Sequence, residues 1–256
     1  MITKKPVTNL GNGDFDVFVQ PKYDAKTEKV VGLEALSRFI KEDGEVILPF
    51  RYIEELSANG ELVNLDFYMF EKICKMLSEW GNLFDNLVEK MPISVNFDKI
   101  TLESPEFLER FFNIAKSYNI NPDEVEVEIT ELNSFKDFKL AHNVINSLRE
   151  NGYKVSIDDY GKNSSAFTII RQIDVDTIKI DREIVVESEY NQKAFLILEA
   201  VTNLAKRFGM TVVAEGVETS EQLEIIKKIG CSAVQGWYFS KAMSKENFKE
   251  YMLSIK

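Results

Sequence analysis

The sequence predicts an α/β barrel, and three observations support this fold class. Short strand-like segments alternate with longer amphipathic segments along 256 residues, which is typical of parallel strands joined by crossover helices. The strand-like segments number about eight, and the chain is close to the ~250 residues of a (β/α)8 barrel. Hydrophobic residues make up 45% of the chain, with 18 phenylalanines, which allows a sizeable core. An open doubly wound sheet is the alternative fold.

Each predicted strand is a short apolar run rich in β-branched and aromatic residues. The first two, residues 15–21 and 29–39, flank the turn-like segment 23–28, which predicts a hairpin. The others cover residues 92–97, 125–130, 154–158, 176–181, 210–216 and 233–237. No linker or low-complexity segment separates them, so we expect residues 1–256 to form a single domain.

The predicted helices are amphipathic segments between these strands. Ser104 and Pro105 predict a helix start, Thr219 and Gln222 predict a capping box, and Gly230 predicts a helix stop. A long segment at 51–80 is expected to break near Asn59. The helical segments cover residues 51–80, 104–118, 137–151, 164–173, 193–208, 219–230 and a last one from about 245.

Composition limits the classes of function. The net charge of −11 and the pI of about 4.8 argue against duplex nucleic acid as a partner. With His142 as the only histidine, and Cys74 and Cys231 distant in sequence, neither a zinc site nor a disulfide framework is indicated. No apolar run approaches the ~18 residues of a membrane span, and no signal peptide is visible. We therefore expect a cytoplasmic protein, or the cytoplasmic portion of a membrane-tethered parent.

Polar residues end or interrupt nearly every predicted strand, although strands of a parallel sheet should be almost purely apolar. Alone, each could be a helix cap or half of a surface ion pair. The carboxyl ends of barrel strands converge on one face, so together they predict one site. These residues are Glu34, Asn96, Glu128, Asp158 with Asp159, Lys179 with Asp181, Glu215 and Gln235.

Oxygen ligands without histidine or cysteine favour hard cations such as Mg²⁺ or Mn²⁺. The adjacent aspartates Asp158 and Asp159 can bridge two ions, an arrangement known for phosphate ester hydrolysis. Lys179 adds positive charge, and Arg38 could reach a phosphate oxygen. These residue types predict a metal-dependent phosphoesterase, and they equally permit an enolase-like or aldolase-like barrel that stabilises an enolate.

Ordered sequence blocks separate these options, because they resemble the EAL-domain family, the phosphodiesterases that linearise cyclic di-GMP. The naming triplet is Glu34-Ala35-Leu36, and the match runs from about residue 15 to 245. The further blocks are VQP at 19–21, SVNF at 94–97, EITE at 128–131, IDD at 157–159, IKID at 178–181, VVAEGVET at 212–219 and QGWYFSKAM at 235–243. The resemblance implies a modified barrel whose first strand is antiparallel to the others.

The resemblance also implies a role for each matching residue. Metal binding is implied for Glu34, Asn96, Glu128, Asp158 and Asp159, with two Mg²⁺ or Mn²⁺ ions. Catalytic roles are implied for Glu215 at the metal centre as a general base, for Lys179, which orients the attacking water, and for Glu131, which anchors the loop after the aspartates. Substrate contacts are implied for Gln20, Arg38 and Asp181, and supporting roles for Glu218 and Gln235.

The chain departs from the family mainly after the paired aspartates, where DDYGKNSSAF replaces the usual DDFGTGYSSL. This motivates two hypotheses. The first is a phosphodiesterase in which metal-activated water opens cyclic di-GMP to linear pGpG. The second is a catalytically weak or inactive receptor for cyclic di-GMP. An unrelated Mg²⁺ barrel acting on a carbon acid is a third. We expect a homodimer, and a sensor or GGDEF domain in a longer parent protein.

Overall fold

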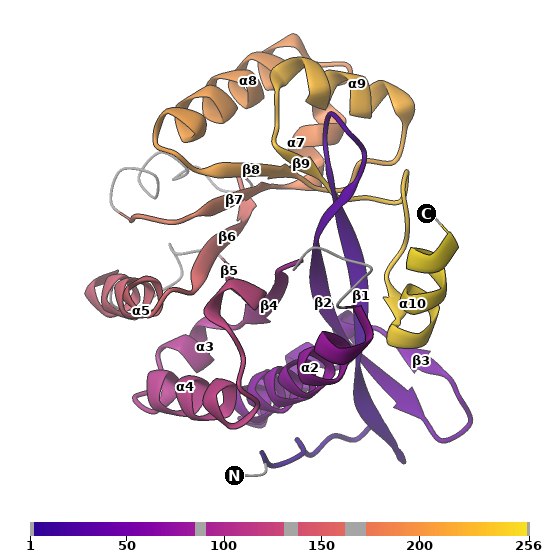
Figure 1. The fold of residues 1–256 in the computed structure, drawn as a ribbon, viewed down its shortest axis with the longest axis vertical. Helices are drawn as coiled ribbons and strands as arrows, with labels where there is room; N and C mark the ends of the chain where they lie inside the picture. Colours follow the sequence, from indigo (N-terminus) through magenta and orange to yellow (C-terminus); the bar gives the residue numbers. More distant parts are fainter. Residues whose placement is uncertain (1–2, 85–90, 131–137, 162–172, 255–256) are drawn as a thin grey trace.

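The computed structural model describes residues 3–84, 91–130, 138–161 and 173–254, and its strands form a closed barrel surrounded by helices (Figure 1). The sheet order is β10-β1-β9-β8-β7-β6-β5-β4-β2-β3, and β1 also pairs with β2. That extra pairing closes a ring of eight strands, with β3 and β10 as additions. The predicted barrel is therefore confirmed, and the open sheet is wrong.

Strand β1 (Gly13–Asp24) closes the ring in the antiparallel direction. It forms a long hairpin with β2 (Val30–Lys41), in which Gln20 lies opposite Glu34. It is also antiparallel to β9 (Ala233–Val234), where Tyr23 lies opposite Val234. Alternate residues of β1 are buried, as expected for a strand with one face on the core. The antiparallel first strand is thereby confirmed.

The remaining barrel strands run parallel from β2 round to β9. They are β4 (Ile93–Phe97), β5 (Val125–Thr130), β6 (Lys154–Tyr160), β7 (Thr177–Ile180) and β8 (Thr211–Ala214). Each overlaps a strand expected from the sequence. The short strands β3 (Val46–Ile47) and β10 (Met243–Ser244) were not expected, because two residues are too few for a periodic pattern.

The helices cover the outside of the ring, with α2 and α4 on one side and α8 and α9 on the opposite side (Figure 1). The predicted break near Asn59 is confirmed between α1 and α2. The α-helices are α1 (Ile53–Ala58), α2 (Leu62–Phe84), α3 (Lys99–Leu102), α4 (Phe107–Ser117), α5 (Phe138–Glu150), α7 (Arg182–Glu187), α8 (Gln192–Arg207), α9 (Ser220–Ile229) and α10 (Lys245–Ser254), and the 3-10 helices are η1 (Pro49–Arg51) and η2 (Pro122–Glu124).

The helix boundaries predicted from capping residues are correct for α9 and wrong for the start of α4. The Thr219–Gln222 capping box and the left-handed Gly230 bound α9 as predicted. Ser104 does not begin α4, which starts at Phe107. Its hydroxyl and carbonyl oxygens accept hydrogen bonds from the next backbone N–H groups and form a turn instead. The helix predicted at 164–173 falls almost entirely outside the described residues.

Two different environments fill the fold. Between α2, β4 and α4, phenylalanine rings pack with centroids 4.5–6.1 Å apart, including Phe70, Phe97 and Phe111. Inside the barrel, polar side chains are buried at Lys22 and Glu126.

Across the described ranges, no helix has both the length and the apolar character needed to cross a membrane.

Candidate metal centre

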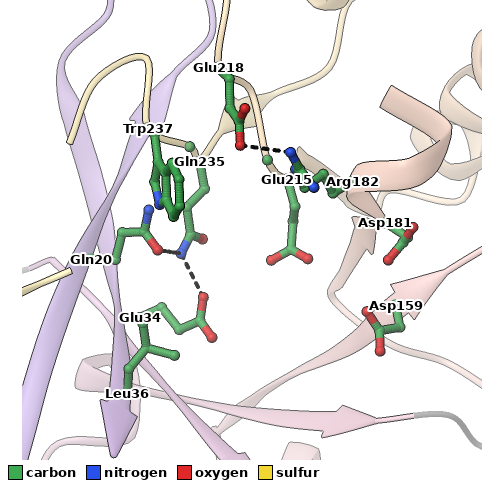
Figure 2. A pocket seen from close by; sticks show the side chains of 12 residues that line it. Gln20, Glu34, Leu36, Asp159, Asp181, Arg182, Glu215, Glu218, Gln235 and Trp237 are labelled. Atoms are coloured by element: carbon green, nitrogen blue, oxygen red, sulfur yellow. Dashed lines mark hydrogen bonds and ion pairs between the residues drawn. The ribbon is translucent and has the colours of Figure 1, made fainter. Parts of the chain in front are cut away.

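The polar residues predicted from the strand ends come together at one mouth of the barrel. Figure 2 shows five of them, namely Glu34, Asp159, Asp181, Glu215 and Gln235. Chain direction explains this, because parallel strands deliver their carboxyl ends to the same face. Glu34 is on β2, Asn96 on β4, Glu128 on β5, Asp158 and Asp159 on β6, and Lys179 on β7, while Glu215 and Gln235 directly follow β8 and β9.

Lys179 is the centre of this cluster. Its Nζ lies 2.7 Å from Glu215 Oε1, 3.3 Å from Asp158 Oδ1 and 3.4 Å from Glu34 Oε2, and it also contacts Glu128 Oε1. The Lys179 side chain is only 1% exposed. One buried ammonium thus faces four carboxylates, which leaves an excess of negative charge that is costly in a buried site without further cations.

The carboxylates form two overlapping groups in which one oxygen from each residue lies within 4.8 Å of the others. The first group is Glu34, Glu128 and Glu215, and the second is Asp158, Asp159 and Glu215. Glu215 belongs to both. The two groups therefore form one continuous acidic cluster.

A β-bulge brings two adjacent aspartates to the same site. Neighbouring residues of a regular strand point to opposite faces. Here the pairing of β6 with β7 shifts register between Ile157 and Tyr160, and Asp159 has a φ of 51°. Aspartate tolerates this left-handed conformation better than most residues do. The bulge therefore allows Asp158 and Asp159 to serve one cluster.

Hydrogen bonds fix the carboxylate of Glu34. Asn96 Nδ2 donates to Oε1 over 3.0 Å, and Gln235 Nε2 donates to Oε2 over 2.6 Å. Gln235 Nε2 also lies 3.2 Å from Gln20 Oε1. Burial raises the pKa of Glu34, but the charge of Lys179 and these donors outweigh burial, so the pKa lies below its ordinary value. Glu34 is held as an anion.

Asp158 has the opposite perturbation. Burial, followed by repulsion from Glu215 and Glu34, raises the pKa of Asp158 well above its ordinary value. The backbone N–H of Asp159 donates to Asp158 Oδ1 over 2.9 Å and only partly offsets this effect. A nearby cation would reverse the shift, because it favours the charged carboxylate.

The donor set fits a hard divalent cation. Glu128 is fully buried, and its Oε2 finds no hydrogen-bond partner among the described residues. Such an orphaned carboxylate oxygen is expensive unless a cation binds it. Carboxylate and amide oxygens without histidine or cysteine are the ligands of Mg²⁺ and Mn²⁺. The acidic cluster is therefore consistent with a metal site, and the identity of the metal stays a prediction.

A cavity of about 500 Å³ opens above the cluster (Figure 2). Leu36 and Trp237 give it apolar walls, and Trp237 is 62% exposed. The described residues that line it are Gln20, Glu34, Leu36, Asp159, Asp181, Arg182, Glu215, Gly216, Glu218, Gln235, Gly236 and Trp237. Its size and mixed lining suit a small organic ligand.

Two predicted substrate residues differ in their relation to this cavity. Asp181 lines it, and its Oδ1 accepts a 2.7 Å hydrogen bond from Glu183 N at the start of α7. Arg38 is not among the described lining residues. Its Nη1 donates to the carbonyl oxygen of Ser37 over 2.7 Å, and its guanidinium lies 5.7 Å from the ring centroid of Phe18.

The two residues predicted to support the metal site make different contacts. Gln235 reaches the cluster through Glu34. Glu218 instead forms an ion pair with Arg182, with Oε1 2.9 Å from Nη2. Glu131 and the divergent segment 162–166 lie outside the described residues, so their predicted roles stay predictions.

Sequence reasoning missed a second polar layer below the cluster. Lys22 Nζ lies 2.5 Å from Ser94 Oγ and 3.5 Å from Glu126 Oε2, and all three residues are buried. A signal was present, because Glu126 precedes Glu128 by two positions and must share its face of β5. No role was assigned to Arg182, which directly follows the IKID block, or to Trp237, which lies within the QGWYFSKAM block.

Comparison with known proteins agrees with this geometry. The sequence profile of the EAL domain matches residues 7–242. Among curated relatives, the chain is 31% identical to the probable cyclic di-GMP phosphodiesterase PdeB and 29% identical to the oxygen sensor protein DosP, both of Escherichia coli K12. The alignments cover 93% and 96% of this chain, but only 45% of PdeB and 30% of DosP. The chain thus spans less than half the length of these relatives.

A solved structure shares the fold. The complex of the PaMucR phosphodiesterase with c-di-GMP superposes with a TM-score of 0.84 at 24% identity, covering 91% of this chain and 94% of the other. At this identity the likeness supports the fold alone. The profile match spans nearly the whole chain, and the chain therefore belongs to the EAL-domain family of cyclic di-GMP phosphodiesterases.

Proposed function

We propose that this chain is a metal-dependent phosphodiesterase that hydrolyses cyclic di-GMP to linear pGpG. The observation that carries the proposal is the pair of carboxylate groups sharing Glu215 at the base of a cavity of about 500 Å³. A family with this activity and a ligand-sized cavity directly above the carboxylates both favour a phosphodiester as substrate. The enolate chemistry left open by residue types has no support from the family match.

The proposed cation ligands follow from the two groups. Glu34 and Glu128 would hold one ion, Asp158 and Asp159 would hold the other, and Glu215, which belongs to both groups, would lie beside them as the base. Asn96 would add its Oδ1 to the first set, since its Nδ2 already donates to Glu34. When bound, Mg²⁺ or Mn²⁺ neutralises phosphate charge and lowers the pKa of water.

The protein's own residues would do the remaining chemistry. Glu215, whose side chain is 20% exposed, borders the cavity and would accept a proton from the attacking water. The water oxygen would then bond to phosphorus and the P–O bond to one ribose oxygen would break. That leaving oxygen would take up the proton held by Glu215, so that one water is added overall. Lys179 would donate hydrogen bonds to the water and hold the carboxylates in place through its ion pairs with them. Leu36 offers an apolar contact for guanine, and the indole of Trp237 offers a flat surface on which the base could stack.

The direct test incubates the pure protein with cyclic di-GMP and Mg²⁺ or Mn²⁺ and follows pGpG by chromatography. We expect turnover with either metal, none with excess chelator, and inhibition by Ca²⁺, which favours looser and higher coordination. Glu128→Gln should abolish turnover. Glu45→Gln, on an exposed turn, removes the same charge away from the site and should leave turnover unchanged. Absence of pGpG under both metals would refute the proposal.

The receptor remains the second candidate because of the sequence divergence at 162–166. In that case cyclic di-GMP binds without useful hydrolysis. Calorimetry distinguishes the two, since micromolar or tighter binding with negligible turnover is expected only of the receptor. The intact set of carboxylates favours the enzyme, because a receptor for a dianionic nucleotide gains nothing from surplus negative charge.

A further inference from the structure

The cavity above the metal cluster is strongly acidic, with one exception. Among the described residues that line it, Arg182 is the only one with a positive charge. The carboxylates around it are Glu34, Asp159, Asp181, Glu215 and Glu218. A cyclic dinucleotide carries two phosphodiesters, and only one can react at the metal cluster. The other must lie elsewhere in an acidic cavity, where it needs a cationic partner.

The stem of Arg182 is fixed against the backbone after β8. Gly216 has a φ of 65°, and a Cβ added there would lie 2.6 Å from both Cβ and Cδ of Arg182. Such distances leave no room for a side chain, so glycine is required for the close approach of Arg182. The arginine is therefore held beside Glu215 by packing as well as by charge.

The guanidinium of Arg182 is bound by an exchangeable partner. Its Nη2 lies 2.9 Å from Glu218 Oε1, and the two side chains are 57% and 34% exposed (Figure 2). Ion pairs this exposed contribute little to stability. A phosphodiester, whose two non-bridging oxygens can accept two parallel N–H groups of a guanidinium, can replace the carboxylate.

Arg38, which the sequence predicts to contact the substrate, does not lie in an equivalent position. The Nη1 of Arg38 donates to the carbonyl oxygen of Ser37, and Arg38 does not line the cavity among the described residues. Among the described residues, Arg182 is thus the cation that lines the cavity and that can leave its ion-pair partner, Glu218, at a low cost in free energy.

We propose that Arg182 binds the phosphodiester that is not cleaved, and that Glu218 holds the guanidinium in place until substrate displaces it. The inference rests on the proposed function, because it needs a substrate with a second phosphodiester. Arg182 is a substrate-positioning residue in this scheme. It acts on binding and leaves the chemistry at Glu215 and Lys179 unchanged.

A double-mutant cycle tests this with cyclic di-GMP at saturating Mn²⁺, which removes any effect of Glu218 on metal affinity. The proteins are the parent, Arg182→Met, Glu218→Gln and the double variant. We expect Arg182→Met to raise KM by at least about tenfold, because at least one charge-assisted hydrogen bond to the substrate is lost. The kcat of this variant should stay within about threefold of the parent value. The same rise should appear in the Glu218→Gln background, and Arg182→Lys should recover part of it.

The control is Arg207→Met at the end of α8, at the opposite end of β8 from Glu215, which changes net charge equally and should leave KM unaltered. Circular dichroism and the melting temperature verify folding of each variant. If Arg182→Met has no effect once Glu218 is neutral, Arg182 only compensates that carboxylate and the inference is wrong. A fall in kcat at constant KM also overturns it.

The outcome for the parent protein separates the two proposals. If the parent hydrolyses cyclic di-GMP and Arg182→Met has the parent KM, only the inference fails. If the parent binds without turnover, the same cycle is run on Kd by calorimetry, with the same expected ratios. If the parent neither binds nor hydrolyses cyclic di-GMP, the proposed function fails and the inference fails with it.

Discussion

Below the acidic cluster, the buried pair of Lys22 and Glu126 allows a quantitative prediction. Their side chains are 6% and 9% exposed, and Nζ lies 3.5 Å from Oε2. The Lys22 ammonium also lies 2.5 Å from Ser94 Oγ. The other oxygen of Glu126, Oε1, has no hydrogen-bond partner among the described residues. Lys22→Met therefore leaves a buried carboxylate without its compensating charge.

The magnitude follows from this geometry. At 3.5 Å and an effective dielectric constant of 20, the attraction is about 5 kcal/mol. Removing one partner of a buried pair typically costs about 3–5 kcal/mol, because the other charge stays buried. Replacing both partners with neutral side chains of similar shape removes that penalty. We expect Lys22→Met to lower the free energy of unfolding by about 3–5 kcal/mol, and the double variant with Glu126→Gln to recover at least about 2 kcal/mol.

Urea denaturation at pH 7, followed by circular dichroism, measures both values. Lys75→Met serves as the control, because Lys75 Nζ and Glu79 Oε1 are 4.0 Å apart on the exposed face of α2. That variant should change the free energy of unfolding by less than about 1 kcal/mol. A Lys22→Met cost below 1 kcal/mol, or a double variant no more stable than the single, would refute the electrostatic reasoning.

Three further predictions follow from other residues. Burial raises the pKa of Asp66 to about 7, so its folded form holds a proton that the unfolded chain has released above pH 4. The free energy of unfolding should fall by up to about 1.4 kcal/mol per pH unit between about pH 4 and pH 7 and level off above that, and Asp66→Asn should reduce this slope in urea titrations. Gly230→Ala should cost about 1–2 kcal/mol, since Gly230 ends α9 with a φ of 85°, and a thermal melt without a shift would contradict this. Saturating Mn²⁺ should stabilise the parent by about 3 kcal/mol at a hundred times Kd, but should stabilise Glu128→Gln much less, as differential scanning fluorimetry would detect.

Much of the fold could be predicted from the sequence because parallel strands leave a strong local pattern. Segments such as 125–130 are rich in β-branched residues, and they are bounded by helix signals. The location of the site followed from the same periodicity. A polar residue at the end of one strand means little, but Glu34, Glu128 and Glu215 at the ends of different strands must meet in a closed barrel.

The features that sequence did not predict depend on geometry that emerges only after folding. The bulge at Asp159 depends on a register shift between β6 and β7. The pairing of Glu218 with Arg182 joins residues 36 positions apart and has no periodic signature. The start of α4 at Phe107 was missed because Ser104 has two local uses, a helix cap or a turn, and the short helix just before it favours the turn.

Closure of the barrel by an antiparallel first strand has a consequence for biosynthesis. Gln20 and Gln235 touch across this seam although they are 215 positions apart, and Gln235 also orients Glu34. Contacts so distant in sequence form late, because loop closure must precede them. A nascent chain that already carries Glu34 and Asn96 therefore has two residues of the acidic site before the site itself has formed. The centre matures only when the last barrel strand leaves the ribosome and docks beside the first.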